Sequence, residues 1–212
     1  MTRGKFITIE GTEGAGKSTA LQFIEDYLLN SKINVVVTRE PGGTEIAEEI
    51  RKVLLYPAGS ETMLPQTELL LMFACRAQHL SQCIQPALRK GKWVVSDRYI
   101  DASYAYQGGG RGIRLEDIKQ LDTMIVGRHY PDLTFVLDIS PELGLERAEK
   151  RGTQKDRIEQ EKIDFFNRVR SQYLMRAKAD PERMKVIDAS QTITAVHMQI
   201  ADILKNFIES AT

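Results

Sequence analysis

The stretch GTEGAGKS, residues 11–18, constrains the fold more than any other part of this sequence. It matches the pattern Gly, any four residues, Gly-Lys-Ser/Thr, whose backbone N–H groups curl around a phosphate. An apolar run precedes it and a helical pattern follows, which is the strand–loop–helix context that the pattern requires. A chance glycine-rich turn has no such context, so we interpret residues 11–18 as a phosphate-binding loop.

Short apolar runs alternate with longer helical patterns along the whole chain. The apolar runs are residues 6–10, 34–38, 93–97, 133–138 and 185–188. The helical patterns include residues 20–29, 44–55, 67–89, 115–126 and 195–208. Continuous apolar strands separated by helices predict an α/β fold, here a five-stranded parallel sheet with helices on both faces. With the phosphate-binding loop, this is the P-loop NTPase fold, and we expect one domain over residues 1–212.

Composition excludes several classes of partner. Lys plus Arg equals Asp plus Glu at 29 each, and a dedicated nucleic-acid binder usually has a basic excess. No apolar run has the length of a signal peptide or a membrane span. Cys75 and Cys83 are eight residues apart on one predicted helix, too far to bridge, and no His or Cys partners cluster with them. We therefore expect a cytoplasmic protein with reduced thiols and no membrane or nucleic-acid partner.

The loop residues have the chemistry of an ATP site. Lys17 can reach the β- and γ-phosphates, Ser18 can ligate Mg²⁺, and Asp97 ends a strand where a carboxylate can hold Mg²⁺ through water. The residues predicted to bind ATP are Gly11, Thr12, Glu13, Gly14, Ala15, Gly16, Lys17, Ser18 and Thr19.

A phosphate-binding loop alone leaves the class of protein open. A GTP-driven switch usually has an Asn-Lys-x-Asp and an Asp-x-x-Gly stretch, and neither occurs here. A nucleic-acid motor is normally longer and more basic. A small kinase remains, with a non-catalytic nucleotide-binding protein as the rival from another class.

Two arginines at strand ends predict a second phosphate site, for the acceptor. Arg39 and Arg98 each follow an apolar run, and a guanidinium can grip a phosphate at two points. Phe73 and Arg76 lie at i and i+3 on one helical face, where an aromatic plane and a planar donor can stack on a base and bond its carbonyl edge.

The chain resembles the thymidylate kinase family, of the bacterial type with lid arginines. The resemblance depends on IEGTEGAGKST, TREPGGT, the Phe73/Arg76 helix, DRY followed by SYAYQGGGRG, LDISPELGLERAEKRG, and DRIEQE with FFNRVR. It implies phosphoryl transfer from ATP–Mg²⁺ to dTMP, giving dTDP in dTTP biosynthesis. It also implies a homodimer, to which the apolar run 69–72 contributes unless that run is intramolecular core.

The resemblance also implies roles for single residues. Phe73 would stack on thymine, Arg76 would bond its carbonyl edge, and Ser103 and Gln107 would line the base pocket. Arg39 and Arg98 would hold the dTMP phosphate. Tyr106 would crowd the 2′ position of the sugar, and Glu10 would lie near the sugar hydroxyl or the metal-bound waters.

In part of this family, an arginine within the phosphate-binding loop supplies positive charge for catalysis, and this sequence has no arginine there. The variable loop positions Thr12, Glu13, Gly14 and Ala15 carry no basic residue, so we expect a lid to supply the charge. The basic stretch 146–161 is broken by Gly152 and Thr153, although mixed-charge runs of this kind are usually solvated helices. We place the lid at about residues 147–160 and predict that Arg151 and Arg157 reach the ATP phosphates.

Two further points stay open from the sequence. The acceptor can be another nucleoside monophosphate or a free deoxynucleoside, although a phosphate-free acceptor would leave Arg39 and Arg98 without a partner charge. By the same resemblance, residues 187–195 are expected to border the ATP base.

Overall fold

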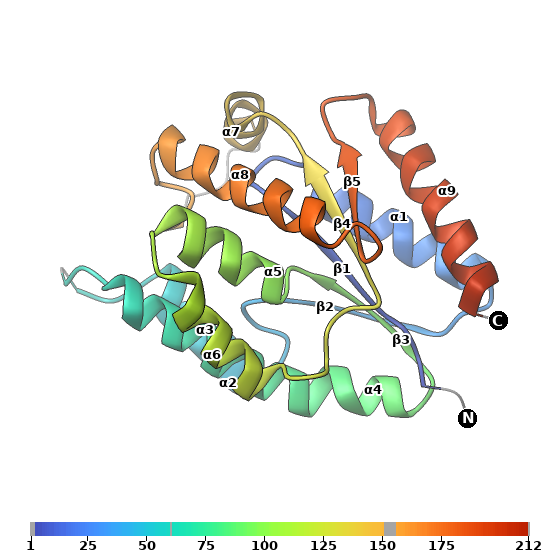
Figure 1. Cartoon of the computed structure of the whole chain (residues 1–212), viewed down its shortest axis with the longest axis horizontal. Helices are drawn as coiled ribbons and strands as arrows, with labels where there is room; N and C mark the ends of the chain where they lie inside the picture. Colours follow the sequence, from blue (N-terminus) through green and yellow to red (C-terminus); the bar gives the residue numbers. More distant parts are fainter. Residues whose placement is uncertain (1–2, 60, 151–155, 212) are drawn as a thin grey trace.

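A five-stranded parallel sheet forms the centre of the molecule (Figure 1). The computed structural model describes residues 3–59, 61–150 and 156–211. Its strands are β1 (Phe6–Gly11), β2 (Val35–Arg39), β3 (Trp93–Asp97), β4 (Leu133–Asp138) and β5 (Met184–Asp188), in the order β2-β3-β1-β4-β5. Every pairing is parallel. The predicted α/β sheet is confirmed, with each strand starting and ending within one residue of the apolar run that predicted it.

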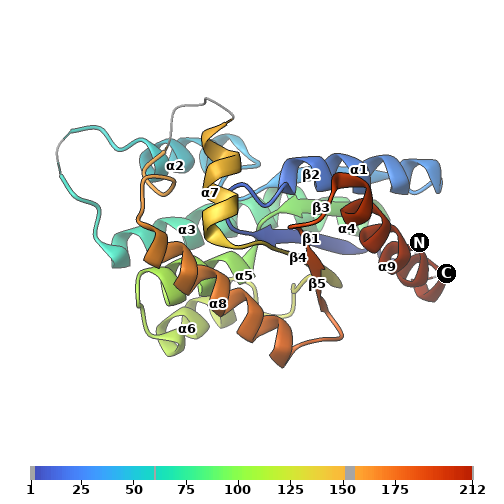
Figure 2. The same cartoon turned by 90° about the horizontal axis from the view of Figure 1, so that it is seen from above.

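Helices cover both faces of the sheet, as Figure 2 shows from above. The helices are α1 (Lys17–Asn30), α2 (Glu45–Leu55), α3 (Pro65–His79), α4 (Gln85–Arg89), α5 (Ile100–Ser103), α6 (Leu115–Ile125), α7 (Pro141–Glu149), α8 (Ile163–Ala179) and α9 (Ile193–Ala211). Two π-helical segments, η1 (Leu80–Ile84) and η2 (Tyr104–Gly110), continue α3 and α5. Within these residues, no helix combines the length and apolarity that a membrane span requires.

Side-chain alternation along β1 divides the core in two. Ile7 and Ile9 pack with α1 and α9 in one cluster, whereas Phe6 packs with α3, α4 and α6 in another. Successive residues of a strand point to opposite faces, so a continuous apolar run buries both.

The helix α2 begins where its sequence predicts. The Thr44 Oγ1 accepts a hydrogen bond from the Ala47 N–H at 3.4 Å, which caps the helix. The helix then packs on α3 through Leu54, Leu55 and Met72. These contacts bring the inner face of α2 to the edge of the sheet where the strands end.

The segment 100–110 folds as a helix that the sequence patterns did not predict. A Cβ atom on Gly110 would lie 2.4 Å from the Phe165 ring, and one on Gly109 would lie 2.8 Å from the Gln172 Cβ. These two glycines therefore allow η2 to pack directly on α8, and π-helical turns of this kind are frequent at functional sites. The packing fixes Tyr106 and Gln107 near the carboxyl ends of β1 and β3.

Candidate active site

The loop between β1 and α1 forms the phosphate cradle. Gly14 and Gly16 have φ values of 71° and 87°, in the left-handed region that glycine adopts without strain. A Cβ on Gly14 would also lie 1.8 Å from the backbone oxygen of Gly144, so α7 packs directly against the loop. The loop leads into the N-terminus of α1, which favours an anion.

Lys17 is a buried ammonium inside this cradle. Its Nζ donates to the Thr12 oxygen at 2.8 Å and to the Gly11 oxygen at 3.1 Å. Burial, followed by the repulsion of Arg98, lowers the pKa of Lys17 to about 8. The negative charge of a phosphate would offset both effects by stabilising the charged form of Lys17, so the electrostatics of the loop favour an anion.

A cavity over the loop contains the residues that the sequence assigned to metal and phosphate. Lys17, Ser18, Asp97 and Arg98 line it together. The Asp97 Oδ1 is buried and has no hydrogen-bond partner among the described residues. Arg147 lines the same cavity and donates to the Ala189 oxygen at 2.8 Å.

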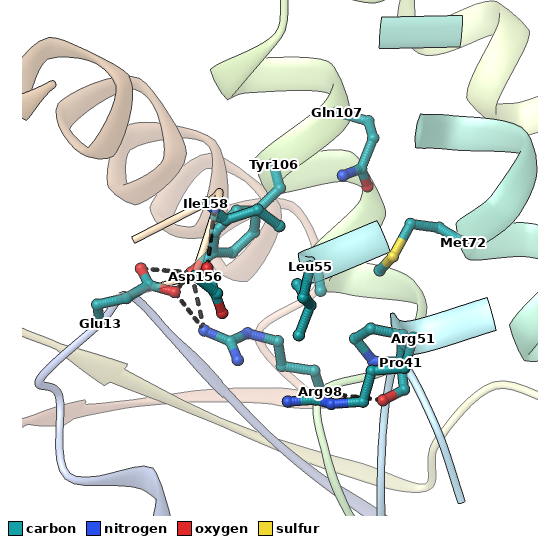
Figure 3. A pocket seen from close by; sticks show the side chains of 11 residues that line it. Glu13, Pro41, Arg51, Leu55, Met72, Arg98, Tyr106, Gln107, Asp156 and Ile158 are labelled. Atoms are coloured by element: carbon teal, nitrogen blue, oxygen red, sulfur yellow. Dashed lines mark hydrogen bonds and ion pairs between the residues drawn. The ribbon is translucent and has the colours of Figure 1, made fainter. Parts of the chain in front are cut away.

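A second cavity lies beside the first, and we call it the acceptor-side pocket (Figure 3). Arg98 and Arg51 line both cavities. The Arg98 Nη2 donates to the Glu13 Oε1 at 2.8 Å and to the Tyr106 hydroxyl at 2.9 Å, and its Nε is buried without a partner among the described residues. Arg98 has a φ of 67°, a conformation that is uncommon outside glycine and that functional sites often contain.

Arg51 is the site residue that sequence reasoning missed. Its Nη1 donates to the Pro41 oxygen at 2.7 Å, across a loop with a cis Glu40–Pro41 bond. The spacing of the sequence could have identified Arg51 as a residue of the buried helix face. It lies four residues after the buried Ala47 and three before the buried Leu54, on the inner face of α2. A cation on a buried helix face needs an anionic partner, which this cavity provides room for.

Arg39, predicted to grip the acceptor phosphate, lines neither cavity in this structure. Its guanidinium forms a two-point ion pair with Glu48 of α2, at 2.9 Å and 3.1 Å, and its side chain is 54% exposed. The first turn of α2 supplies this carboxylate directly beside the end of β2. The predicted contact with phosphate therefore requires Arg39 to leave Glu48.

Phe73 and Arg76 lie together as predicted, but both are buried behind the pocket wall. The Arg76 guanidinium carbon is 4.9 Å from the centre of the Phe73 ring. Arg76 donates to Glu40 at 2.8 Å, to the Ser103 Oγ at 2.9 Å and to the Tyr99 oxygen at 2.9 Å. The roles predicted for Phe73, Arg76 and Ser103 at the base stay predictions.

Glu10 also lies below the site, not in its wall. Its carboxylate accepts from the Tyr99 N–H at 2.8 Å and from the Tyr173 hydroxyl at 2.7 Å, and it is fully buried. Burial and the nearby Asp101 raise the pKa of Glu10 to about 7. The predicted place of Glu10 near the sugar hydroxyl or the metal-bound waters stays a prediction.

Glu10 should give the folded chain a specific pH dependence of stability. Between about pH 4.5 and pH 7 the folded chain keeps the Glu10 proton that the unfolded chain has lost, so this residue's contribution falls as pH rises. We expect the free energy of unfolding of the wild type to decline relative to Glu10→Gln by up to about 3 kcal/mol over this interval. Denaturant titrations at several pH values would measure it, and parallel curves for the two proteins would contradict the assignment.

Arg157 contacts α2 and α3 in this structure. Its Nη1 lies 2.7 Å from the Glu68 Oε2 of α3, and its Nε donates to the Leu54 oxygen at 3.0 Å. These partners place Arg157 beside α2 and α3, and its predicted role at the ATP phosphates stays a prediction. Arg151, the other predicted lid arginine, lies outside the described residues.

A third cavity borders the loop on the side of α9. Gly16, Thr19 and Arg147 line it together with Ile193 and His197. The predicted base-bordering segment 187–195 contributes four of its lining residues, which are Ala189, Gln191, Thr192 and Ile193.

The fold and these cavities define a class of protein. A phosphate cradle and a second pocket share two arginines, which is the arrangement of a P-loop kinase that acts on a small phosphorylated acceptor. The family model for thymidylate kinase matches residues 9–200. The chain belongs to the thymidylate kinase family.

Relatives of nearly equal length agree with this assignment. Thymidylate kinase from Ruthia magnifica subsp. Calyptogena magnifica is 54% identical over 205 residues, covering 97% of this chain and 99% of that protein. Thymidylate kinase from Pseudomonas fluorescens (strain SBW25) is 51% identical over 208 residues, covering 98% of each chain. The crystal structure of thymidylate kinase from Ehrlichia chaffeensis superposes with a TM-score of 0.77 at 34% identity, covering 96% of this chain and 99% of that one.

Proposed function

We propose that the two cavities carry out the family's reaction, transfer of the γ-phosphoryl of ATP to dTMP in the synthesis of dTTP. One observation supports the proposal most directly: Arg98 and Arg51 line both cavities, so the same cations would reach a donor phosphate in one and an acceptor phosphate in the other. Transfer needs two phosphates close together and positive charge around the moving group more than it needs acid–base groups.

The donor side of this reaction belongs to the loop. Lys17 would neutralise the β- and γ-phosphates while the loop N–H groups surround them. The third cavity would take the adenine base, because the predicted segment and Thr19 line it. Arg147 lines both the loop cavity and the third one, so it is the described lid arginine nearest to this role. The role of Arg151 stays a prediction.

We also propose Mg²⁺ as the metal that ATP brings. Among the described residues, no group of three or more His, Cys, Asp or Glu side chains could hold a metal ion. This fits Mg²⁺, which usually binds phosphate oxygens and waters with one or two protein ligands. Ser18 would be a direct ligand and the unpartnered Asp97 Oδ1 would hold a metal-bound water. When bound, the ion supplies charge neutralisation at the transferred group.

On the acceptor side, Arg98 and Arg51 would bind the phosphate, and Arg39 would join them if it left Glu48. Tyr106 and Gln107 are the pocket residues suited to the sugar and the base. Phe73, Arg76 and Ser103 are buried and would need a rearrangement of the pocket wall to reach the base.

Tyr106 should have two separable effects. Tyr106 lines the acceptor-side pocket, and its hydroxyl donates to the Glu13 Oε2 at 2.9 Å and accepts from the Arg98 Nη2 at 2.9 Å. We expect Tyr106→Phe to lower kcat/KM for dTMP about tenfold or more by removing charge-assisted hydrogen bonds, with discrimination against the ribonucleotide kept. We expect Tyr106→Ala to relax that discrimination. Paired assays with dTMP and its ribonucleotide would measure both, and wild-type discrimination in Tyr106→Ala would refute the steric role.

One assay tests the proposed function. Purified protein would be given ATP with dTMP, dUMP, dCMP or thymidine, and ADP release would be followed with and without a magnesium chelator. We expect rapid transfer to dTMP that the chelator abolishes. Transfer to thymidine would support the nucleoside-kinase alternative, and nucleotide binding without transfer to any acceptor would support a non-catalytic protein.

We propose a homodimer that uses the outer face of α3. In the apolar run 69–72, Leu69 and Met72 are buried in the chain's own core, whereas Leu70 is 57% exposed. Leu64, directly before α3, is also exposed at 63%, so a second copy that packs on this part of α3 would cover two apolar side chains. Sedimentation of the wild type and of Leu70→Glu would test it, since a monomeric wild type refutes the dimer.

We propose a cytoplasmic location because the cysteines of the chain are reduced. Cys75 and Cys83 are both free thiols, as expected of a chain in a reducing compartment.

A further inference from the structure

The Gln107 side chain is held from behind by a single carboxylate. Its Nε2 donates to the Glu68 Oε1 of α3 at 2.8 Å, and both residues are almost completely buried. Gln107 lines the acceptor-side pocket, and Figure 3 shows its side chain reaching toward that pocket from η2. The other half of the amide, Oε1, is buried and has no partner among the described residues. A buried polar atom without a partner beside a pocket is suited to a ligand.

Glu68 has a fixed protonation state because two arginines surround it. Arg157 lies 2.7 Å from its Oε2, and the Arg111 Nε lies 3.1 Å from the same oxygen. Burial alone would raise the pKa of Glu68, but the Gln107 hydrogen bond and the two arginines outweigh it and lower the pKa. Glu68 is therefore an ionised carboxylate.

An ionised carboxylate can only accept hydrogen bonds, and this decides how Gln107 is oriented. If the amide turned over, its oxygen would face the Glu68 oxygen, and two acceptors would meet in a buried site. The NH₂ group must therefore face Glu68, and the carbonyl oxygen is the atom left for the pocket. The orientation follows from the charge of Glu68, since the two ends of an amide are otherwise nearly the same in shape.

We propose that Glu68 is a positioning residue that sets the base specificity of the acceptor site by fixing Gln107 as a hydrogen-bond acceptor. A pyrimidine with an N–H at ring position 3, thymine or uracil, satisfies the Gln107 oxygen. Cytosine has an unprotonated nitrogen there and leaves the buried oxygen unpaired, which is how sites built on hydrogen bonds reject an analogue. This inference depends on the proposed function, because it requires the base of the acceptor nucleotide to occupy this pocket.

A purely structural role for Glu68 makes a different prediction. Glu68 also anchors Arg111 and Arg157, so its removal can disturb the pocket wall as a whole. Such a disturbance would lower kcat/KM for every acceptor by a similar factor. The ratio of kcat/KM for dTMP to kcat/KM for dCMP therefore distinguishes a specificity role of Glu68 from a purely structural role.

The decisive variant is Glu68→Gln. A neutral amide can donate as well as accept, so Gln107 becomes free to turn its NH₂ group into the pocket. We expect the dTMP-to-dCMP ratio of kcat/KM to fall by about tenfold or more, with KM for ATP within about twofold of the wild type. A folded variant that keeps the wild-type ratio overturns the inference.

Two further variants provide a control and a second test of the inference. Glu161→Gln is the matched control. Among the described residues, Glu161 pairs with the same Arg111, whereas the Gln107 amide donates to Glu68, so the ratio of this variant should stay at the wild-type value. Gln107→Met removes the amide and leaves Glu68 with its arginines; its ratio should fall as in Glu68→Gln. If Glu68→Gln does not fold, Gln107→Met decides alone, and a wild-type ratio there overturns the inference. A wild type that transfers to neither nucleotide would instead refute the proposed function.

Discussion

Replacing Arg98 with alanine is expected to lower kcat/KM for dTMP by about 10³-fold or more, the scale of an arginine that stabilises a transferred phosphoryl group. Arg98 lines both cavities and its Nε has no partner among the described residues, so it has a donor free for a phosphate. KM for ATP should change much less, because the loop and Lys17 hold the donor. Steady-state kinetics with each substrate varied in turn would measure the difference.

Two further variants separate charge from geometry at this position. Arg98→Lys keeps a positive charge but loses the planar fork that grips two oxygens, so it should recover only a small part of the activity. Arg89→Ala, at the exposed end of α4, is the control and should behave like the wild type. An Arg98→Ala enzyme with near-normal kcat/KM would remove the central residue of the proposed mechanism.

Replacing Lys17 with methionine is expected to lower kcat by about a hundred- to a thousandfold, because the variant lacks the charge that faces the transferred group. The methionine side chain fills similar space, so the loop should keep its fold. Lys52→Met serves as the control, because it removes an exposed lysine of α2 that pairs with Glu49 at the surface. An active Lys17→Met enzyme would mean that other cations neutralise the donor phosphates.

The pKa of Lys17 adds a pH dependence to this prediction. In the free enzyme its pKa is lowered to about 8, so the ammonium loses its proton as pH rises above that value. Affinity for ATP should therefore weaken between about pH 8 and pH 10 in the wild type, whereas Lys17→Met should bind weakly throughout without this change. Equilibrium binding of ATP at several pH values would test the sign.

The sequence predicted the sheet well because its central strands β1, β3 and β4 are mostly buried and the edge strands β2 and β5 are also apolar runs. A continuous apolar run needs no knowledge of its neighbours to be recognised as a strand, and the loop at residues 11–18 follows one of them directly. The helix at 100–110 was missed because its glycines oppose helix formation locally. Only contact with α8, through Phe165 and Gln172, makes them favourable.

The site was predicted less completely, and the three arginines show why. Arg39 pairs with Glu48, whereas Arg51 lines the cavity. Which arginine takes which place depends on how α2 packs beside β2. Arg157 was expected at the ATP phosphates because it belongs to a basic segment. Its partner Glu68 is far away in sequence, and only the packing of α3 brings the two together.

Glu13 gives the enzyme a direct mechanical link between its two substrates. This one carboxylate of the donor loop bonds Arg98 and Tyr106 of the acceptor wall. A donor that shifts the loop must therefore alter the wall, and an acceptor phosphate that draws Arg98 away must loosen the loop. By thermodynamic reciprocity, each nucleotide then changes the affinity of the enzyme for the other by the same factor.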